Sequence, residues 1–259
     1  LYEAFGWDVP TYVHLPLIVG NDGRKLSKRH GATSFADLVG EGYLPAAIIN
    51  YIALLGWCPK DTRELFTLDE LCRVFSIDGI SKSPSVFDYD KLDWFNAEYI
   101  RAMEPSAFLA LIRPDLDRAF AGRSCEEPLL AEMLQPRLTR LTQLPAMIHF
   151  LIERQEYSPE LFFNKKNKVS PEQAKDVLPV IRQALADQAA WTREAVHDSL
   201  MALAAGRQLK TGQVMWPLRI GLSGQEITPG GAVEIAVVLG REESLARLQL
   251  AIERLNEQL

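Results

Sequence analysis

The sequence has few cysteines and no long hydrophobic run. Three cysteines occur in 259 residues, with no CxxC pair and no Cys/His group at metal-ligand spacing. No apolar run approaches the ~18 residues needed to cross a bilayer, and no basic and then apolar leader opens the chain. We therefore expect no disulfide framework, no protein-bound metal and no membrane partner, and we predict reduced thiols in a cytoplasmic protein.

The chain also lacks an excess of positive charge. Its 28 Lys and Arg are outnumbered by 34 Asp and Glu, which gives a net charge of −6, and its hydrophobic content of 47% is ample for a folded core. This balance excludes a protein that coats nucleic acid by bulk charge, but it does not exclude a local basic footprint. Residues 21–31 carry four Lys or Arg against one Asp, and residues 164–168 carry three Lys and no acid.

Hydrophobic periodicity predicts a mainly α protein. Apolar side chains recur at i, i+3 and i+4 through most of the chain after residue 34, and cap or proline signals precede several of these stretches. The first twenty residues instead mix aromatic and β-branched residues around Pro10 and Pro16, which predicts one or two short strands. The expected fold is a set of stacked helical subdomains with a small mixed α/β edge region at the N-terminus.

Local signals predict several boundaries. Thr67 opens a capping box at the start of one helix, and Ser170 caps the start of another. We expect a helix over 90–99 with a turn near Asn96, and a helical stretch over 127–144. Breaks near residues 105 and 157 predict three parts, which are 1–104, 105–156 and 157–259.

The sharpest local feature is the basic segment Lys25-Leu26-Ser27-Lys28-Arg29, which follows a turn signal at residues 21–23. Lysines supply mobile point charges, and a hydroxyl or a backbone N–H supplies a directed donor, so the segment suits a polyphosphate. Cations placed where charge develops on a transferring phosphoryl group accelerate its transfer. The alternative interpretation is a solvated basic turn.

This segment resembles the second ATP motif of class I aminoacyl-tRNA synthetases, in the form typical of bacterial glutamyl-tRNA synthetases. Other stretches resemble the same family and occur in the same order along the chain. These stretches are Tyr43-Leu44-Pro45, Asn50-Tyr51, Leu55-Gly56-Trp57, Phe87-Asp88, Lys91-Leu92, Trp94-Phe95-Asn96, Gly212-Gln213-Val214, Trp216-Pro217-Leu218-Arg219 and Thr228-Pro229-Gly230. The resemblance covers the C-terminal part of that family, without its HIGH-type motif, and the chain begins without Met. We therefore expect the sequence to be part of a longer protein.

The resemblance implies an ATP-phosphate site at the basic segment. Lys25, Ser27 and Lys28 match positions that hold the phosphates during formation of glutamyl-adenylate, with the two lysines acting in catalysis, and Arg29 adds to the field. Mg²⁺ accompanies ATP in that reaction. Glutamate and ATP bind through the N-terminal half of the family's enzymes, so the 259 residues alone are expected to be inactive.

The resemblance also implies contacts with tRNA(Glu). Residues 43–99 resemble the region that docks on the inner side of the tRNA, where Lys91, Trp94 and Arg101 are the candidate contacts. The alternative interpretation places Trp94 in the core and leaves the two cations solvated.

Residues 105–259 resemble the helical anticodon-binding domains. Arg137 matches the arginine that reads the third anticodon base and so separates glutamate tRNA, with C, from glutamine tRNA, with G. Arg219 and Thr228 match further anticodon-loop contacts, whereas Gly231 stands where the family has Leu. The alternative for Arg137 is a pairing with a carboxylate on its own helix.

Two other functions compete with a monomeric, discriminating glutamate–tRNA ligase. One is a stand-alone tRNA-binding module without catalysis, and the other is a non-discriminating enzyme that also charges glutamine tRNA. Glutaminyl-tRNA synthetase fits less well, because that enzyme ends in β-barrels and this chain keeps a helical pattern to Leu259.

Overall fold

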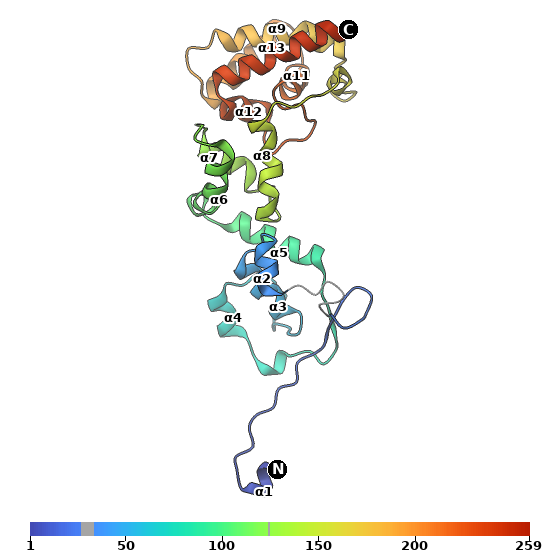
Figure 1. The fold of residues 1–259 in the computed structure, drawn as a ribbon, viewed down its shortest axis with the longest axis vertical. Coiled ribbons are helices and arrows are strands. Elements are labelled where there is room, and N and C mark those ends of the chain that lie inside the picture. Colours follow the sequence, from blue (N-terminus) through green and yellow to red (C-terminus); the bar gives the residue numbers. More distant parts are fainter. Residues whose placement is uncertain (27–33, 124) are drawn as a thin grey trace. The chain divides into compact units, whose positions relative to one another are not determined.

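The computed structural model describes residues 1–26, 34–123 and 125–259. Within these ranges lie 13 α-helices and one two-stranded sheet, which confirms the predicted mainly α fold with a small mixed region near the N-terminus (Figure 1). The chain divides into two compact units, one formed by Leu1–Ala102 with Thr139–Leu141 and the other by Met103–Leu138 with Thr142–Leu259. The finer division of the second unit near residue 157 stays a prediction.

The first unit packs short helices beside a minimal sheet. Its elements are α1 (Tyr2–Phe5), β1 (Ile18–Val19), α2 (Phe35–Gly40), α3 (Pro45–Leu54), α4 (Leu68–Val74), the 3₁₀ turn η2 (Ile77–Gly79), β2 (Ser85–Val86) and α5 (Tyr89–Ala102). Strand β1 pairs with β2 in parallel, with Ile18 opposite Ser85 and Val19 opposite Val86. The strand predicted among the first twenty residues is therefore only two residues long, and residues 7–17 carry neither helix nor strand.

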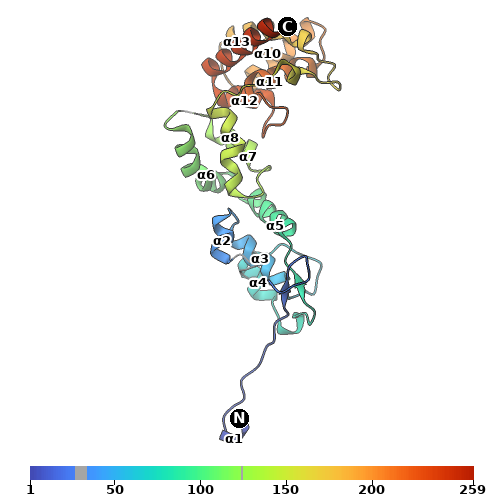
Figure 2. The ribbon, with the colours of Figure 1, turned by 45° about the vertical axis from the view of Figure 1, so that its right-hand side comes forward.

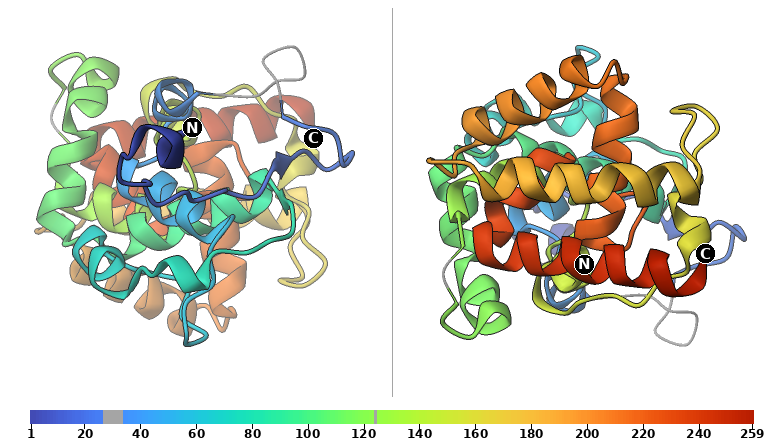
Figure 3. Two further views of the ribbon diagram at one scale, coloured as in Figure 1. Left: turned by 90° about the horizontal axis from the view of Figure 1, so that it is seen from below. Right: turned by 90° about the horizontal axis from the view of Figure 1, so that it is seen from above.

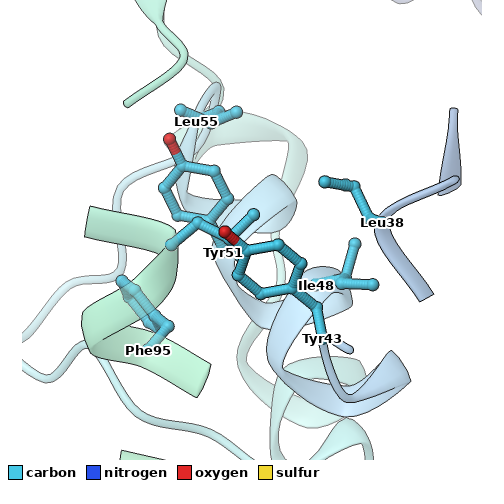
Figure 4. Packing of buried hydrophobic residues seen from close by; sticks show 7 residues of the cluster. Leu38, Tyr43, Ile48, Tyr51, Leu55 and Phe95 are labelled. Atoms are coloured by element: carbon cyan, nitrogen blue, oxygen red, sulfur yellow. The ribbon is translucent and has the colours of Figure 1, made fainter. Parts of the chain in front are cut away.

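Apolar residues from α2, α3 and α5, with Tyr43 between α2 and α3, form one of the core clusters of the first unit. Figure 4 shows Tyr43, Ile48, Tyr51 and Phe95 packed together, and all four are buried. The Tyr51 hydroxyl donates to the Asp88 carbonyl at 2.9 Å and accepts from the Asp88 amide at 2.7 Å. Burial raises the pKa of Tyr51 to about 12, so the phenol stays protonated and keeps both bonds at neutral pH.

Two buried asparagines connect α3 and α5 to the loops around them. The Asn50 side chain accepts from the Phe66 amide at 2.7 Å and donates to the Glu64 carbonyl at 2.9 Å. Asn96 accepts from the Leu44 amide at 2.7 Å. The turn expected near Asn96 was wrong, because its side chain bonds to groups outside the helix and α5 runs unbroken.

All the regular elements of the second unit are helices in the residues that the structure describes, apart from one isolated β-bridge between Asn164 and Val169. Its elements are α6 (Pro105–Phe120), α7 (Glu127–Leu134), the 3₁₀ turn η3 (Leu141–Gln143, which begins in the first unit), α8 (Leu144–Ile152), the 3₁₀ turn η4 (Pro159–Phe162), α9 (Pro171–Ala186), α10 (Arg193–Gly206), α11 (Thr211–Ser223), α12 (Ala232–Leu239) and α13 (Arg241–Gln258). Figure 2 shows α6, α7 and α8 grouped together, and α6 contacts both of the others.

Sequence signals predicted the start of one helix in each unit and missed the end of another helix. The Thr67 and Ser170 caps are confirmed, since each hydroxyl accepts from the backbone N–H three residues later, at 3.2 and 3.3 Å. The prediction of a helical stretch over 127–144 was wrong, because the helix that begins there does not continue to residue 144. Helix α7 stops at Leu134, two residues before Pro136, which has no backbone N–H to continue the helical hydrogen bonds.

Helices α9 and α13 lie side by side (Figure 3) and share the most extensive helix pairing of the second unit. A buried arginine on α13 joins this pair to the rest of the unit. Arg247 is 4% exposed, and its guanidinium donates to the carbonyls of Phe150 at 2.5 Å, Leu151 at 3.2 Å and Leu222 at 2.8 Å. One charged side chain thus satisfies carbonyls at the C-terminal ends of α8 and α11.

Glu243 neutralises this arginine and a second one. Its carboxylate accepts from Arg247 Nε at 2.7 Å and from Arg154 Nη2 at 2.6 Å. Hydrogen bonds from Arg154, together with those from Arg247, lower the pKa of Glu243 to about 2. The ionised carboxylate therefore stabilises the folded unit at neutral pH.

We expect Glu243→Gln to cost about 2 kcal/mol of unfolding free energy at pH 7, with the difference from the unchanged protein vanishing in acid. The folded-state pKa lies below the ordinary value, so the stabilisation is complete above that ordinary value and is lost as pH falls towards about 2. Urea unfolding at pH 7 and pH 3 measures this change.

Glu242→Gln is the matched control, because Glu242 has no ion-pair partner among the described residues and should show little pH-dependent difference. A Glu243→Gln deficit equally large at both pH values would contradict the assignment.

Candidate nucleic-acid interface

Three residues far apart in the sequence line one hollow in the second unit. Arg137 follows the end of α7, Arg219 lies in α11, and Thr228 lies in the loop between α11 and α12. We call this cavity, of about 450 Å³, the arginine hollow. Its remaining lining residues are Glu132, Met133, Pro136, Arg193, Glu226, Ile227, Pro229, Gly230, Gly231 and Glu234. The structure thus brings together all three residues that the sequence singled out after position 105.

Arg137 and Arg219 lie close enough in the hollow to act on each other electrostatically. Arg219 is partly buried and donates from Nη1 to the Glu226 carbonyl at 3.3 Å. Burial and then the nearby charge of Arg137 lower the pKa of Arg219, although an arginine remains protonated at neutral pH. Arg137 is exposed and has no ion pair with any described residue, so the alternative pairing with a carboxylate on its own helix is not present. Two adjacent guanidiniums favour a ligand with electronegative atoms.

Two of the three glutamates that line the hollow, Glu132 and Glu234, pair with a third arginine, Arg193. Arg193 pairs with Glu132 at 3.0 Å and with Glu234 at 2.7 Å, and hydrogen bonding to Glu132 raises its pKa. The Thr192 hydroxyl accepts from the Ala195 amide at 3.2 Å and so fixes the first turn of α10, where Arg193 lies. Since this bridge holds both acids, they do not neutralise Arg137. Sequence reasoning missed Arg193, and only the Thr192 cap signal marks its position.

A side chain of the loop before α12 bonds to the backbone of the same loop. Thr228 is 6% exposed, and its hydroxyl donates to the Gly230 carbonyl at 2.7 Å. The hydroxyl proton is therefore used within the loop, which leaves the oxygen as an acceptor for a ligand. Gly231 caps the N-terminus of α12, and a Cβ there would lie 2.5 Å from Glu234 Oε2. The glycine thus leaves room for the carboxylate that binds Arg193.

The basic segment of the first unit is only partly described. The backbone of Lys25 pairs with Val19 as an antiparallel bridge after the predicted turn, in which Gly23 has φ +73°. Lys25 is exposed at the edge of an apolar cavity of about 410 Å³ whose lining includes Phe35 and Phe87. Ser27, Lys28 and Arg29 lie outside the described residues.

Helix α5 carries the other three predicted contacts on one side, as the spacing of positions 91, 94 and 101 requires. Lys91 Nζ lies 2.6 Å from Glu64 Oε1, and Arg101 pairs with Glu98, so both cations are surface ion pairs. Trp94 is 40% exposed and packs edge-on against Phe95. The indole is therefore not wholly in the core and leaves a surface on which a ligand can pack.

The described residues contain no group of three or more His, Cys, Asp or Glu side chains that could hold a metal ion. Separately, none of the helices in those ranges combines the length and apolar character needed to cross a membrane.

Comparison with known families gives two matches that overlap around α5. The family described as anticodon binding domain matches residues 81–252, and the catalytic domain of class I tRNA synthetases for E and Q matches residues 1–94.

The similar individual proteins are glutamate–tRNA ligases. The glutamate–tRNA ligase of Clostridium botulinum (strain Eklund 17B / Type B) is 43% identical over 98% of this chain and 53% of its own length. That of Clostridium tetani is 42% identical over 100% of this chain and 53% of its own. A crystal structure of a glutamate tRNA ligase from Elizabethkingia meningosepticum, in complex with its amino acid, superposes with a TM-score of 0.84 at 30% identity, covering 98% of this chain and 53% of that one. The chain spans about half the length of these relatives.

Proposed function

Because this chain belongs to the glutamate–tRNA ligase family of class I aminoacyl-tRNA synthetases, we propose that it binds the anticodon loop and inner stem of tRNA(Glu). The observation that carries the proposal is the meeting of Arg137, Arg219 and Thr228 in the arginine hollow. Single-stranded loop bases offer their edges to arginine forks and their faces to apolar side chains, and this hollow provides both kinds of surface.

Arg137 is the proposed reader of the third anticodon base. Its planar fork has donors only, so it matches the two acceptors N3 and O2 on the Watson–Crick edge of cytosine and is repelled by the N1–H and N2–H₂ groups on the Watson–Crick edge of guanine. Arg219 and Thr228 hold the loop beside it. Lys91, Trp94 and Arg101 are proposed to contact the stem from α5, where the ion pairs of the two cations open to admit phosphates.

The basic segment is proposed to serve the chemical step of the same protein, in which glutamate is activated with ATP and transferred to tRNA. Lys25 and Lys28, with Ser27 and Arg29, would hold the ATP phosphates and stabilise the charge that develops on them. Mg²⁺ would enter with ATP and neutralise phosphate charge. We further propose that the protein acts as a monomer in the cytoplasm.

The proposal predicts that this chain binds a tRNA(Glu) transcript in a manner that depends on the anticodon loop. Replacing that loop with an unrelated tetraloop is expected to weaken binding at least about tenfold, since base-edge and stacking contacts are each worth ~1–3 kcal/mol. Fluorescence anisotropy at fixed salt concentration measures the dissociation constants. Equal affinity for the two transcripts would overturn the anticodon assignment.

A further inference from the structure

An apolar side chain projects from the loop that borders the arginine hollow. Ile227 is 82% exposed and lines the hollow together with Arg137 and Arg219. A single exposed isoleucine is ordinary on a protein surface. This one differs because the residues on both sides of it are held in place.

Hydrogen bonds fix the backbone around Ile227. On one side, the Glu226 carbonyl accepts from Arg219. On the other side, Thr228 is buried and its hydroxyl is bonded to the Gly230 carbonyl. A β-branched side chain on such a backbone has few rotamers, so little conformational entropy is lost when a ligand packs on it.

Arg137 and Arg219, which line the same hollow, favour a ligand that carries hydrogen-bond acceptors. A purely apolar partner would leave two guanidiniums facing a surface that offers them no acceptor. A nucleobase presents an apolar face and an edge with acceptors, so it can pack on the isoleucine while its edge meets Arg137 or Arg219.

We propose that Ile227 is the apolar contact for a base of the anticodon loop, so that one base is bound by its face on Ile227 and its edge on the arginines. The inference rests on the proposed function, because it takes the loop as the ligand. It assigns to this chain a base-contacting residue next to the buried Thr228, on the side away from Gly231.

Ile227→Ala is expected to weaken binding of the tRNA(Glu) transcript about 3- to 10-fold, since it removes part of one apolar contact. The dependence of affinity on salt should keep its slope, because no phosphate-binding charge is lost. Ile227→Leu should restore most of the affinity. Leu250→Ala, which truncates another exposed side chain of the second unit, should bind like the unchanged chain.

A spectroscopic probe tests the contact directly. Transcripts with 2-aminopurine at each anticodon position in turn should include one whose fluorescence changes on binding to the unchanged chain and changes less with Ile227→Ala. If the unchanged chain binds with loop dependence while Ile227→Ala gives the same affinity and the same fluorescence, this inference fails and the proposed function stands. If the unchanged chain shows no loop dependence, the proposed function fails, and this inference fails with it.

Discussion

Replacing Arg247 with methionine is expected to lower the unfolding free energy of the second unit by about 3–5 kcal/mol. Methionine fills much of the same volume but donates no hydrogen bond. The buried carbonyls of Phe150, Leu151 and Leu222 would then lose a donor, and Glu243 would lose one of its two arginines. Each unsatisfied buried acceptor costs roughly 1–3 kcal/mol, so the combined effect exceeds that of any surface ion pair.

Native-state hydrogen exchange of the α8, α11 and α13 amides measures this loss in the second unit alone. The matched control is Arg118→Met on α6, since that side chain is 78% exposed and its ion pair with Asp115 lies at the surface. The control should change stability by less than about 1 kcal/mol. A loss for Arg247→Met no larger than for the control would show that the buried bonds contribute little.

Arg137→Gln is expected to reduce discrimination between C and G at the third anticodon position by about 10- to 100-fold. Glutamine carries both a donor and an acceptor, so it can bond to the Watson–Crick edge of either base, without the repulsion between a donor-only fork and the N–H groups of guanine. The substitution should leave folding intact, because Arg137 is exposed and its side chain makes no ion pair among the described residues. The ratio of dissociation constants for two transcripts that differ only at that base gives the discrimination.

Arg118→Gln controls for the general loss of one positive charge from the second unit. An unchanged ratio in Arg137→Gln would refute the role assigned to Arg137. Equal binding of the two transcripts by the unchanged chain would instead favour the non-discriminating enzyme.

Short sequence signals, such as helix caps, predicted part of the fold. The Thr67 and Ser170 capping boxes were predictable because each needs only residues three apart. That α5 runs unbroken through Asn96 was not predictable, because the side chain of Asn96 bonds to Leu44 and Thr139, which lie 52 and 43 positions away in the sequence. The end of α7 was not predicted, although Pro136 lies two residues beyond it. Apolar residues continue at helical spacing after the proline, and this spacing favoured a longer helical stretch.

Some residues of the candidate site could likewise be predicted from the sequence, and others could not. Arg137, Arg219 and Thr228 were found through a family resemblance, and their convergence needed the fold. Arg193 carries no local signal of its own, because its partners lie 61 and 41 residues away. The importance of Ile227 lies in its exposure, which depends on how the loop is held and which composition does not report.

The bridge from Arg193 to Glu132 and Glu234 has an evolutionary consequence. Both acids border the arginine hollow, and their ion pairs are with Arg193 and not with the two arginines assigned to the tRNA, so a change at either acid alters the local field without removing a base-contacting side chain. Loss of either acid would release part of the positive charge of Arg193 and strengthen attraction for any RNA, whereas gain of an acid nearby would weaken it. A lineage can therefore adjust how tightly it holds RNA while leaving untouched the residues that decide which RNA is held.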